Sequence, residues 1–386
     1  MKRPSRAEQH PPQAGAVKRA PATSRTLLRR IAPNLLLVFG SVVLVSLATE
    51  VAFRIYFHGT LATEYLQQEV NATWLGDFTQ PSANTALRYE LKPGVDVNWG
   101  GVRVVTSTDG TQRIASAHAP PAHPALKIAV LGDSSSFGWG VPYEQTYGEL
   151  LRQLLEQRLG QPVEVRNYSV PGYNTAQERV VFESYVLPWK PDLLILHHDF
   201  NDADPIEGKP LNYMAADYGD NPLRSVAIKW FLRGIYQRQI NRVMWVPEDP
   251  QHPTQVYAHY RCAGPLYEQH LRDLAAIAQE ATRHHIRLLA FIFNPWLQRQ
   301  TDFEQDPFYT LLHQPLARAL QSDGFTVVDS YPLYQQVMAS NGWENLSPLW
   351  VGPKDAHPSA SGHGFIARVL FEDILSTGML DASAKP

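Results

Sequence analysis

The stretch KIAVLGDSSSFGWG (127–140) begins with an apolar run typical of a buried strand and passes through a tight turn at Gly132, Asp133 and Ser134 into a helix. Similar apolar runs recur at 163–169, 192–199, 286–294 and 326–332, and helical patterns occupy 147–160, 175–187, 264–285, 309–324 and 361–375. Short continuous Val, Ile and Leu runs that alternate with amphipathic helices predict a parallel sheet covered on both faces. The predicted fold class is therefore α/β, with three layers in the order helix, sheet, helix.

The composition indicates a large folded chain. It has 386 residues, of which 44% are hydrophobic and 18% charged, and this excludes a mostly disordered or fibrous protein. Residues 1–30 hold eight Lys or Arg against the single Glu8, a net charge of +7, which leaves −10 for residues 31–386. Because a nucleic-acid binder carries its positive charge on the folded part, this split argues against one. The single cysteine, Cys262, excludes an internal disulfide framework and a zinc site built from cysteines.

An uncharged apolar segment follows the basic tail. Residues 31–49 contain no charged side chain, and about 20 such residues cross a bilayer as a helix. We predict a transmembrane helix over 31–53 that acts as a signal-anchor, with the tail at 1–30 in the cytoplasm and the rest outside, as the positive-inside rule requires. A cleaved signal peptide is the competing interpretation. The long basic region and the lack of a clean A-x-A-like site after the apolar run argue against it.

The remaining chain divides into a lead-in segment and one large domain. Residues 54–125 are less regular, with a strand and turn predicted in GVRVVTSTDG (101–110) and a Pro-rich joint in AHAPPAHPA (117–125). The domain spans 126–380. It contains an insertion at 203–263, far longer than an ordinary loop, in which a basic helix is predicted at 224–245. That helix is interpreted as a packed surface helix, with a substrate lid or a surface for anionic lipid or polymer as alternatives.

Chemically distinctive residues follow the predicted strands. Right-handed crossovers place the carboxyl ends of parallel strands at one edge, so Ser134, Gly172 and Asn201 are expected there, after the first, second and third strands. Asp355 and His357 precede the last helix at the same edge. In this set His357 removes the proton of the Ser134 hydroxyl, and Asp355 orients the imidazole. The backbone N–H groups of Ser134 and Gly172 and the side-chain amide of Asn201 are the expected oxyanion donors.

At this point the chain resembles the SGNH/GDSL hydrolase family over about residues 126–380. The residues that match the family's blocks are Gly132, Asp133, Ser134 and Gly138 in the first, Gly172 in the second, Asn201 in the third and His357 in the fifth. The resemblance implies a flavodoxin-like domain and an ester hydrolase that works through an acyl-enzyme. It assigns Ser134 as the nucleophile, Gly172 and Asn201 as oxyanion donors and His357 as the base. Neither a metal nor a cofactor is implied.

Two positions depart from the family pattern. The glycine of the usual third block, GxND, is Asp199 here, and its carboxylate is expected either to crowd an anionic intermediate or to bind a sugar hydroxyl. The fifth block has the spacing D-x-H in place of D-x-x-H, with Lys354 at the position of the usual aspartate. Asp355 is still the best candidate to orient His357, and a loop is expected to bend so that the carboxylate reaches the ring.

Other residues carry alternative hypotheses. One alternative hypothesis is a metal site formed by His197, His198, Asp199, Asp202 and Asp204. Neighbouring strand residues point to opposite faces, so the two histidines are not expected to share an ion. Together with Asp199, Trp139 and Tyr173 are candidate substrate contacts, because aromatic rings near strand ends can stack on sugar rings.

Three functions remain open. The combination of a membrane helix, a lead-in segment and GDSSSFGWGV resembles a membrane-anchored bacterial branch of the superfamily, some members of which move acetyl groups on extracytoplasmic polysaccharides. This implies a single-pass protein of the bacterial inner membrane whose catalytic domain is periplasmic. The leading hypothesis is a serine esterase, such as a carbohydrate acetyl esterase. The alternatives are an O-acyltransferase (acetyltransferase) acting on an envelope or exported polysaccharide and a catalytically silent glycan-binding or scaffold domain. The oligomeric state is left open.

Overall fold

The computed structural model describes residues 24–59, 75–87, 89–116, 119–199, 202–203, 265–295, 297–306, 309–353 and 355–380. Several positions singled out in the sequence lie outside the described residues. They are Asn201, Asp204, Cys262, Lys354 and the predicted basic helix at 224–245, together with nearly all of the insertion at 203–263.

The core of the fold is a mixed eight-stranded sheet with the order β10-β9-β8-β6-β7-β5-β4-β3. Five of its strands are parallel: β6 (Leu126–Leu131), β7 (Val163–Asn167), β8 (Leu193–His198), β9 (Arg287–Ile292) and β10 (Thr326–Asp329). Along the chain these strands are the first to the fifth, so the order in space is 2-1-3-4-5, that of the flavodoxin-like fold. The predicted parallel sheet is confirmed.

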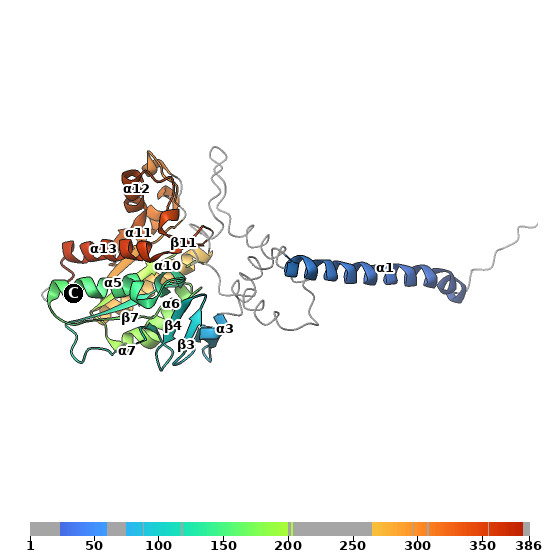
Figure 1. Ribbon diagram of the computed structural model, residues 1–386, viewed down its shortest axis with the longest axis horizontal. Helices are drawn as coiled ribbons and strands as arrows, with labels where there is room; N and C mark the ends of the chain where they lie inside the picture. Colours follow the sequence, from blue (N-terminus) through green and yellow to red (C-terminus); the bar gives the residue numbers. More distant parts are fainter. Residues whose placement is uncertain are drawn as a thin grey trace, which may run out of the picture.

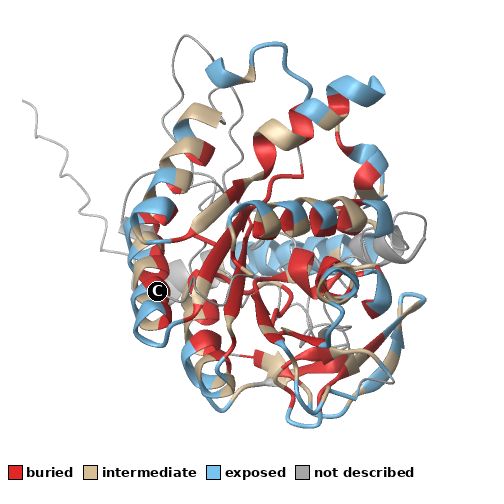
Figure 2. Cartoon of the chain, turned by 90° about the vertical axis from the view of Figure 1, so that its left-hand side faces the viewer, coloured by how far each residue is buried: buried red, intermediate tan, exposed pale blue. Residues whose placement is uncertain are grey.

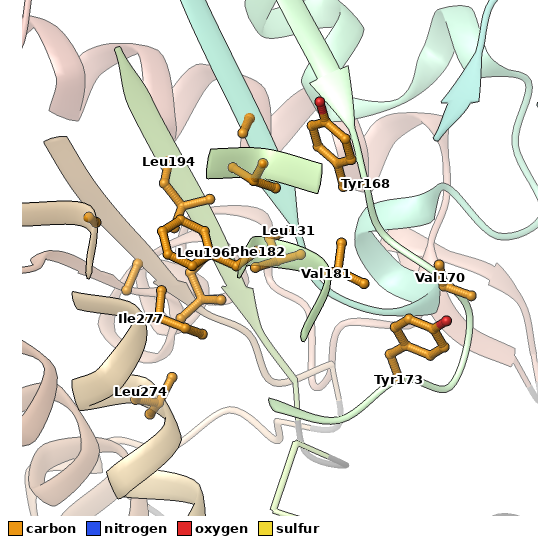
Figure 3. Packing of buried hydrophobic residues seen from close by; sticks show 14 of the residues in the cluster. Leu131, Tyr168, Val170, Tyr173, Val181, Phe182, Leu194, Leu196, Leu274 and Ile277 are labelled. Atoms are coloured by element: carbon orange, nitrogen blue, oxygen red, sulfur yellow. The ribbon is translucent and has the colours of Figure 1, made fainter. Parts of the chain in front are cut away.

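Helices cover both faces of this sheet (Figure 1). One face carries α5 (Tyr147–Leu159), α12 (Ser330–Asn341) and α13 (Ala360–Ser376), and the other carries α6 (Thr175–Val181), α10 (Pro265–Arg283) and α11 (Gln314–Ser322). Strand β8 shows why two cores form. Leu193 and Ile195 pack toward α5 and α13. Leu194 and Leu196 point to the other face and pack toward α6 and α10, as Figure 3 shows. Successive residues of a strand point to opposite faces of the sheet, so a continuous apolar run packs into the core on both faces.

Helix α12 is a departure from the predicted elements. The run TVVDSYP (326–332) was expected to be a strand throughout, but β10 ends at Asp329 and the helix begins at Ser330. The Asp329 carboxylate accepts a hydrogen bond from the Tyr331 N–H at 2.9 Å, which makes it the N-cap. Pro332 then lies in the first turn, where a missing N–H costs nothing. Because the apolar run continues across the start of a helix, its pattern does not show where the strand ends.

Two predicted helices contain π-type turns. The helix expected at 175–187 consists of α6, the π-turn η3 (Phe182–Val186) and the short α7 (Leu187–Trp189). The helix expected at 309–324 begins with the π-turn η6 (Tyr309–His313) and continues as α11. Within the described part of the chain, single 3₁₀ turns form η2 (Tyr143–Gln145), η5 (Phe303–Gln305) and η7 (Ser347–Leu349).

The segment before Leu126 contributes to the same sheet. Strands β3 (Asp96–Trp99), β4 (Val102–Thr106) and β5 (Arg113–Ile114) continue it antiparallel from β7. The short helix α3 (Leu75–Phe78) and the hairpin of β1 (Thr79–Pro81) and β2 (Tyr89–Leu91) precede them. Side chains from this segment are buried in the core shared with α6 and α10, among them Phe78, Leu87, Tyr89 and Leu91. We call residues 75–114 the strand extension.

The N-terminal helix α1 (Ser24–Gly59) stands apart from the α/β domain (Figure 1). Its apolar window, Ala32–Ala52, has a mean hydropathy of 2.2, and none of it is buried against the rest of the protein. Twenty-one helical residues span about 32 Å, enough for the hydrocarbon core of a bilayer. The chain therefore carries one helix near its N-terminus that is long and apolar enough to cross a membrane.

Figure 2 shows that the central strands form the buried interior of the domain. Buried histidines are concentrated at and around one of these strands, β8. His197 packs between Tyr147, Phe291 and Phe293, and burial lowers its pKa to about 3. Burial likewise lowers the pKa of three more imidazoles, to about 3 or well below the usual value. These are His198, His270 and His363. All four rings are therefore neutral in the folded protein at pH 7.

These histidines predict acid-sensitive stability. In the unfolded chain these imidazoles bind protons below about pH 6.5, whereas in the folded chain they bind protons only near pH 3. The free energy of unfolding is therefore highest above about pH 6.5 and falls as the pH drops from there toward 3. Each ring costs about 1.4 kcal/mol of unfolding free energy per pH unit. The expected result is a steep fall in denaturant midpoint from pH 7 to pH 5. In a His197→Leu variant the slope of unfolding free energy against pH should be smaller by the equivalent of one proton. An unchanged slope would contradict the assignment of His197 as a buried, neutral imidazole.

Candidate active site

Ser134 lies at the start of α4 (Ser134–Phe137), a single helical turn directly after β6. Asp133 is its N-cap, and the Asp133 carboxylate accepts a hydrogen bond from the Ser135 N–H at 2.9 Å. At the end of the turn, Gly138 has a left-handed backbone with φ +84°. A Cβ at this position would lie 2.3 Å from Thr146 and 2.9 Å from the Arg113 guanidinium, so only glycine fits.

Arg113 holds the loop that leaves α4. It lies on β5 of the strand extension and is 1% exposed. Its Nη1 donates to the carbonyl oxygens of Phe137 and Gly138 at 2.8 and 2.7 Å, and its Nη2 donates to that of Val141 at 2.8 Å. Burial lowers the pKa of Arg113 to about 10, so the side chain remains charged at neutral pH. Charge-assisted bonds of this kind are stronger than neutral ones and fix the loop 137–141.

Asp355 and His357 lie on one strand of a separate hairpin. Strand β11 (Trp350–Gly352) pairs antiparallel with β12 (Asp355–Pro358). Residues i and i+2 of a strand share a face, so the D-x-H spacing brings the carboxylate to the imidazole without the loop bend expected from the sequence. Asp355 Oδ1 accepts from both the backbone N–H of His357 at 3.1 Å and the ring Nδ1 at 2.5 Å.

The hairpin completes a hydrogen-bonded chain with α4. His357 Nε2 lies 2.8 Å from the Ser134 Oγ, and His357 Nδ1 is bonded to Asp355. With the ring proton on Nδ1, Nε2 accepts the hydroxyl proton. Burial by itself raises the pKa of Asp355. Hydrogen bonds from the His357 ring and backbone, the electrostatic attraction of that ring and a bond from Trp139 outweigh it and leave the pKa below its ordinary value. The carboxylate is therefore ionised at neutral pH, as an orienting group requires.

Gly172 lies in a tight turn after β7. The Tyr173 N–H donates to the Val170 carbonyl at 3.1 Å, and Gly172 has φ +79°, which makes 170–173 a type II turn with Pro171 at its second position. Tyr89 of the strand extension supports this turn, since its hydroxyl donates to the Pro171 carbonyl at 2.8 Å. The Tyr173 hydroxyl donates in return to the Tyr89 carbonyl.

Asp199 is buried beneath the site. It is 1% exposed, and its Oδ2 accepts a hydrogen bond from the Ser135 hydroxyl. Its backbone N–H donates to Asp202 at 3.1 Å. Burial, followed by the charges of Glu178, Asp133 and Asp199, raises the pKa of Asp202 well above the usual value. The carboxylate that replaces the family's glycine therefore ties the end of β8 to α4.

The candidate substrate contacts are placed differently from what the sequence led us to expect. Asp199 and Tyr173 are each 1% exposed and bonded within the protein, so neither is presented to a ligand. Trp139 is half-buried beside His357, and its indole donates to Asp355. Asn201 lies outside the described residues. Sequence reasoning missed Arg113, because an isolated arginine before the domain carries no motif.

The two neighbouring histidines of β8 point to opposite faces, as the alternation predicted. His197 faces Tyr147 and Phe291, whereas His198 Nε2 lies 3.1 Å from the Nε2 of His270 on α10. Within the part of the chain that the structure describes, no three His, Cys, Asp or Glu side chains are grouped to hold a metal ion.

Comparison with known families agrees with this geometry. The model of the GDSL-like lipase/acylhydrolase family matches residues 130–365, which include Ser134, Gly172 and His357. The chain belongs to this family. It is accordingly a GDSL-type hydrolase of ester bonds, and the resemblance stated from its motifs is confirmed. A search of curated proteins found no match to this hydrolase.

Solved structures similar to this GDSL hydrolase are distant. They include TesA, with 15% identity over 64% of this chain and 97% of that one and a TM-score of 0.39. The acetyl xylan esterase AlAXEase has 14% identity over 64% and 100%, with a TM-score of 0.41. The psychrotrophic esterase EstA from Pseudoalteromonas sp. has 11% identity over 65% and 97%, with a TM-score of 0.39. At this distance the likeness says nothing about the substrate of this chain.

The geometry of Asp355 predicts the effect of removing its charge. An Asp355→Asn variant keeps the shape but presents an amide to His357 Nδ1, which favours the wrong tautomer, so we expect kcat to fall by as much as about 10⁴. The measurement is hydrolysis of p-nitrophenyl acetate by the full-length protein in detergent, with circular dichroism to check folding. A folded variant with near-normal kcat would show that Asp355 does not orient the imidazole.

Proposed function

We propose that this GDSL hydrolase is a serine esterase in which Ser134 is the nucleophile, His357 the general base and Asp355 the group that orients it. The observation that carries the proposal is the hydrogen-bonded chain from Asp355 through His357 to the Ser134 Oγ, with distances of 2.5 and 2.8 Å. The 2.8 Å distance from His357 Nε2 to the Ser134 Oγ falls within the range in which a base can take the proton of an attacking hydroxyl.

The reaction then proceeds in two steps. As the Ser134 Oγ attacks the ester carbonyl carbon, its proton passes to His357 Nε2, and the imidazolium later delivers that proton to the leaving alcohol. Water, deprotonated by His357, attacks the acyl-serine, and Ser134 recovers its proton as the acid product leaves. We assign the N–H groups of Ser134 and Gly172 and the Asn201 amide as donors to the carbonyl oxygen while it is negative. Loss of one such donor typically costs about 10²–10³ in rate.

We further propose that the enzyme is anchored in the bacterial inner membrane by α1, with the α/β domain in the periplasm, and that it removes short acyl groups from an envelope polysaccharide. The apolar window of α1 and the net charge of +7 before it support the anchor and its orientation. Trp139 is half-buried and stacks on His357, and the half-buried Trp99 packs against Trp139, so two flat rings that can pack on a sugar lie near the Ser134–His357 pair.

The structure lends no support to a silent scaffold. The two departures from the family pattern, at Asp199 and Asp355, do not favour it, because both residues are bonded to the segments that carry the proposed nucleophile and base. Transfer of the acyl group to a sugar hydroxyl instead of water uses the same acyl-serine, so the acceptor must be measured.

The nucleophile is tested by intact mass of the full-length protein after treatment with a fluorophosphonate. Wild type should gain one adduct at Ser134, while Ser134→Ala and His357→Ala, each folded by circular dichroism, should gain none. A Ser134→Ala protein that still turns over p-nitrophenyl acetate would overturn the assignment. Release of acetate from an acetylated oligosaccharide, with and without a deacetylated acceptor, then separates hydrolysis from transfer.

The anchor and its orientation are tested by reporter fusions. Alkaline phosphatase, which is active only outside the cytoplasm, should be active when fused after the described end of α1 at Gly59. An epitope tag placed at Met1 should remain on the membrane-bound protein, since α1 is not cleaved. Loss of the tag from the exported protein would show a signal peptide, and an inactive fusion that is stably made would contradict the orientation.

A further inference from the structure

Trp139 occupies an unusual position beside the base and its orienting group. It follows α4, one residue after the left-handed Gly138, and its Nε1 donates to Asp355 Oδ2 at 3.1 Å. Its indole lies almost parallel to the His357 imidazole, with 4.9 Å between ring centroids and 19° between ring planes. One side chain therefore contacts both members of the Asp355–His357 pair.

Asp355 needs a second partner because it is not deeply buried. Its side chain is 37% exposed, and that of His357 is 28% exposed. Both residues belong to the two-stranded hairpin of β11 and β12, which does not pair with the main sheet. A carboxylate held through Oδ1 alone can rotate about its χ2 and release the ring. A donor on Oδ2 stops that rotation and leaves Oδ1 directed at His357 Nδ1.

Trp139 is itself held by the strand extension. Trp99, the last residue of β3, packs edge-on against it with 4.8 Å between ring centroids. Trp99 in turn packs edge-on against Phe78, which stacks on Phe137 of α4. The backbone on either side of Trp139 is fixed by the guanidinium of Arg113 on β5, through the carbonyl oxygens of Gly138 and Val141.

We propose that Trp139 is a positioning residue that acts through Asp355 and His357. The indole N–H fixes the outer oxygen of the carboxylate, and the ring covers one face of the imidazole. The strand extension at 75–114 keeps the indole in place through Trp99 and Arg113, so this segment is part of the catalytic apparatus. The inference rests on the proposed roles of Ser134, His357 and Asp355.

The first test separates the N–H of Trp139 from its ring. A Trp139→Phe variant keeps an aromatic ring over His357 but removes the donor to Asp355 Oδ2. Hydrogen bonds to charged groups are stronger than neutral ones, so kcat for p-nitrophenyl acetate should fall about 10-fold or more with KM unchanged. Trp189→Phe is the matched control, because Trp189 packs between Lys127 and Arg166 at the amino end of β6, away from Ser134.

A pH profile distinguishes positioning from general loosening. Without the Trp139 donor, more of the negative charge of Asp355 acts on the imidazolium, and the acid limb of kcat/KM should move to higher pH. On the side of Ser134 away from His357, the titratable group is Asp133, whose Oδ2 lies 3.4 Å from the Ser134 Oγ. Burial holds the pKa of the neighbouring His363 at about 3, so that group is neutral over the assay range.

A double-mutant cycle tests whether Trp139 acts through Asp355. In the Asp355→Asn background the Trp139→Phe change should add no further loss in the rate of fluorophosphonate labelling at Ser134. Equal losses in both backgrounds would overturn the inference, as would a folded Trp139→Phe variant with the kcat and acid limb of wild type.

Folding and the underlying site are controlled separately. If Trp139→Phe does not fold, Trp99→Leu provides the second test, since it leaves the donor in place but removes the ring that holds it. A fall in kcat with a shifted acid limb is expected, and a wild-type profile would overturn the inference. A wild-type protein that does not label at Ser134 would remove the proposed function together with this inference, whereas equal labelling of wild type and Trp139→Phe would remove the inference alone.

Discussion

The 2.8 Å contact between Ser134 Oγ and His357 Nε2 is the constraint on which the rest of the structure depends, because it joins two residues 223 positions apart. A hydrogen bond of this length tolerates little displacement of either partner. Ser134 is placed by the main sheet, after the carboxyl end of its interior strand β6. His357 is placed by a small hairpin outside that sheet and by helix α13, which follows it and packs on α5. The sheet and the hairpin must therefore be held together by other contacts.

Trp139 makes one such contact, to Asp355 and His357 of the hairpin, and the strand extension supports it and the neighbouring loops at the edge of the sheet. Tyr89 supports the Gly172 turn, Arg113 holds the carbonyl oxygens after α4, and Trp99 packs on Trp139. Each contact reaches a loop that carries or adjoins a residue of the site. The strand extension therefore shares the core of the hydrolase domain, where Phe78 and Tyr89 are buried, and its strands β3 to β5 continue the main sheet.

Sequence reasoning succeeded where local pattern and tertiary structure agree. The five parallel strands follow from apolar runs, and the opposite faces of His197 and His198 follow from strand alternation. It failed where a long-range contact decided the outcome. Asp199 was interpreted as a ligand contact because it replaces a glycine near the site, yet the Ser135 hydroxyl, 64 positions away, makes it a buried structural bond.

Sequence analysis alone was sufficient to predict the fold class, the apolar N-terminal helix, the family and the candidates Ser134, Gly172, Asp355 and His357. These depend on periodicity and on short motifs, which a chain carries locally. Three outcomes came from the tertiary structure alone: the D-x-H spacing places two residues on one strand face, Trp139 bonds to Asp355, and strands β3 to β5 join the main sheet. Those outcomes depend on long-range contacts, such as the hydrogen bond between Trp139 and Asp355, which are 216 residues apart in the sequence. No local sequence pattern encodes such a contact.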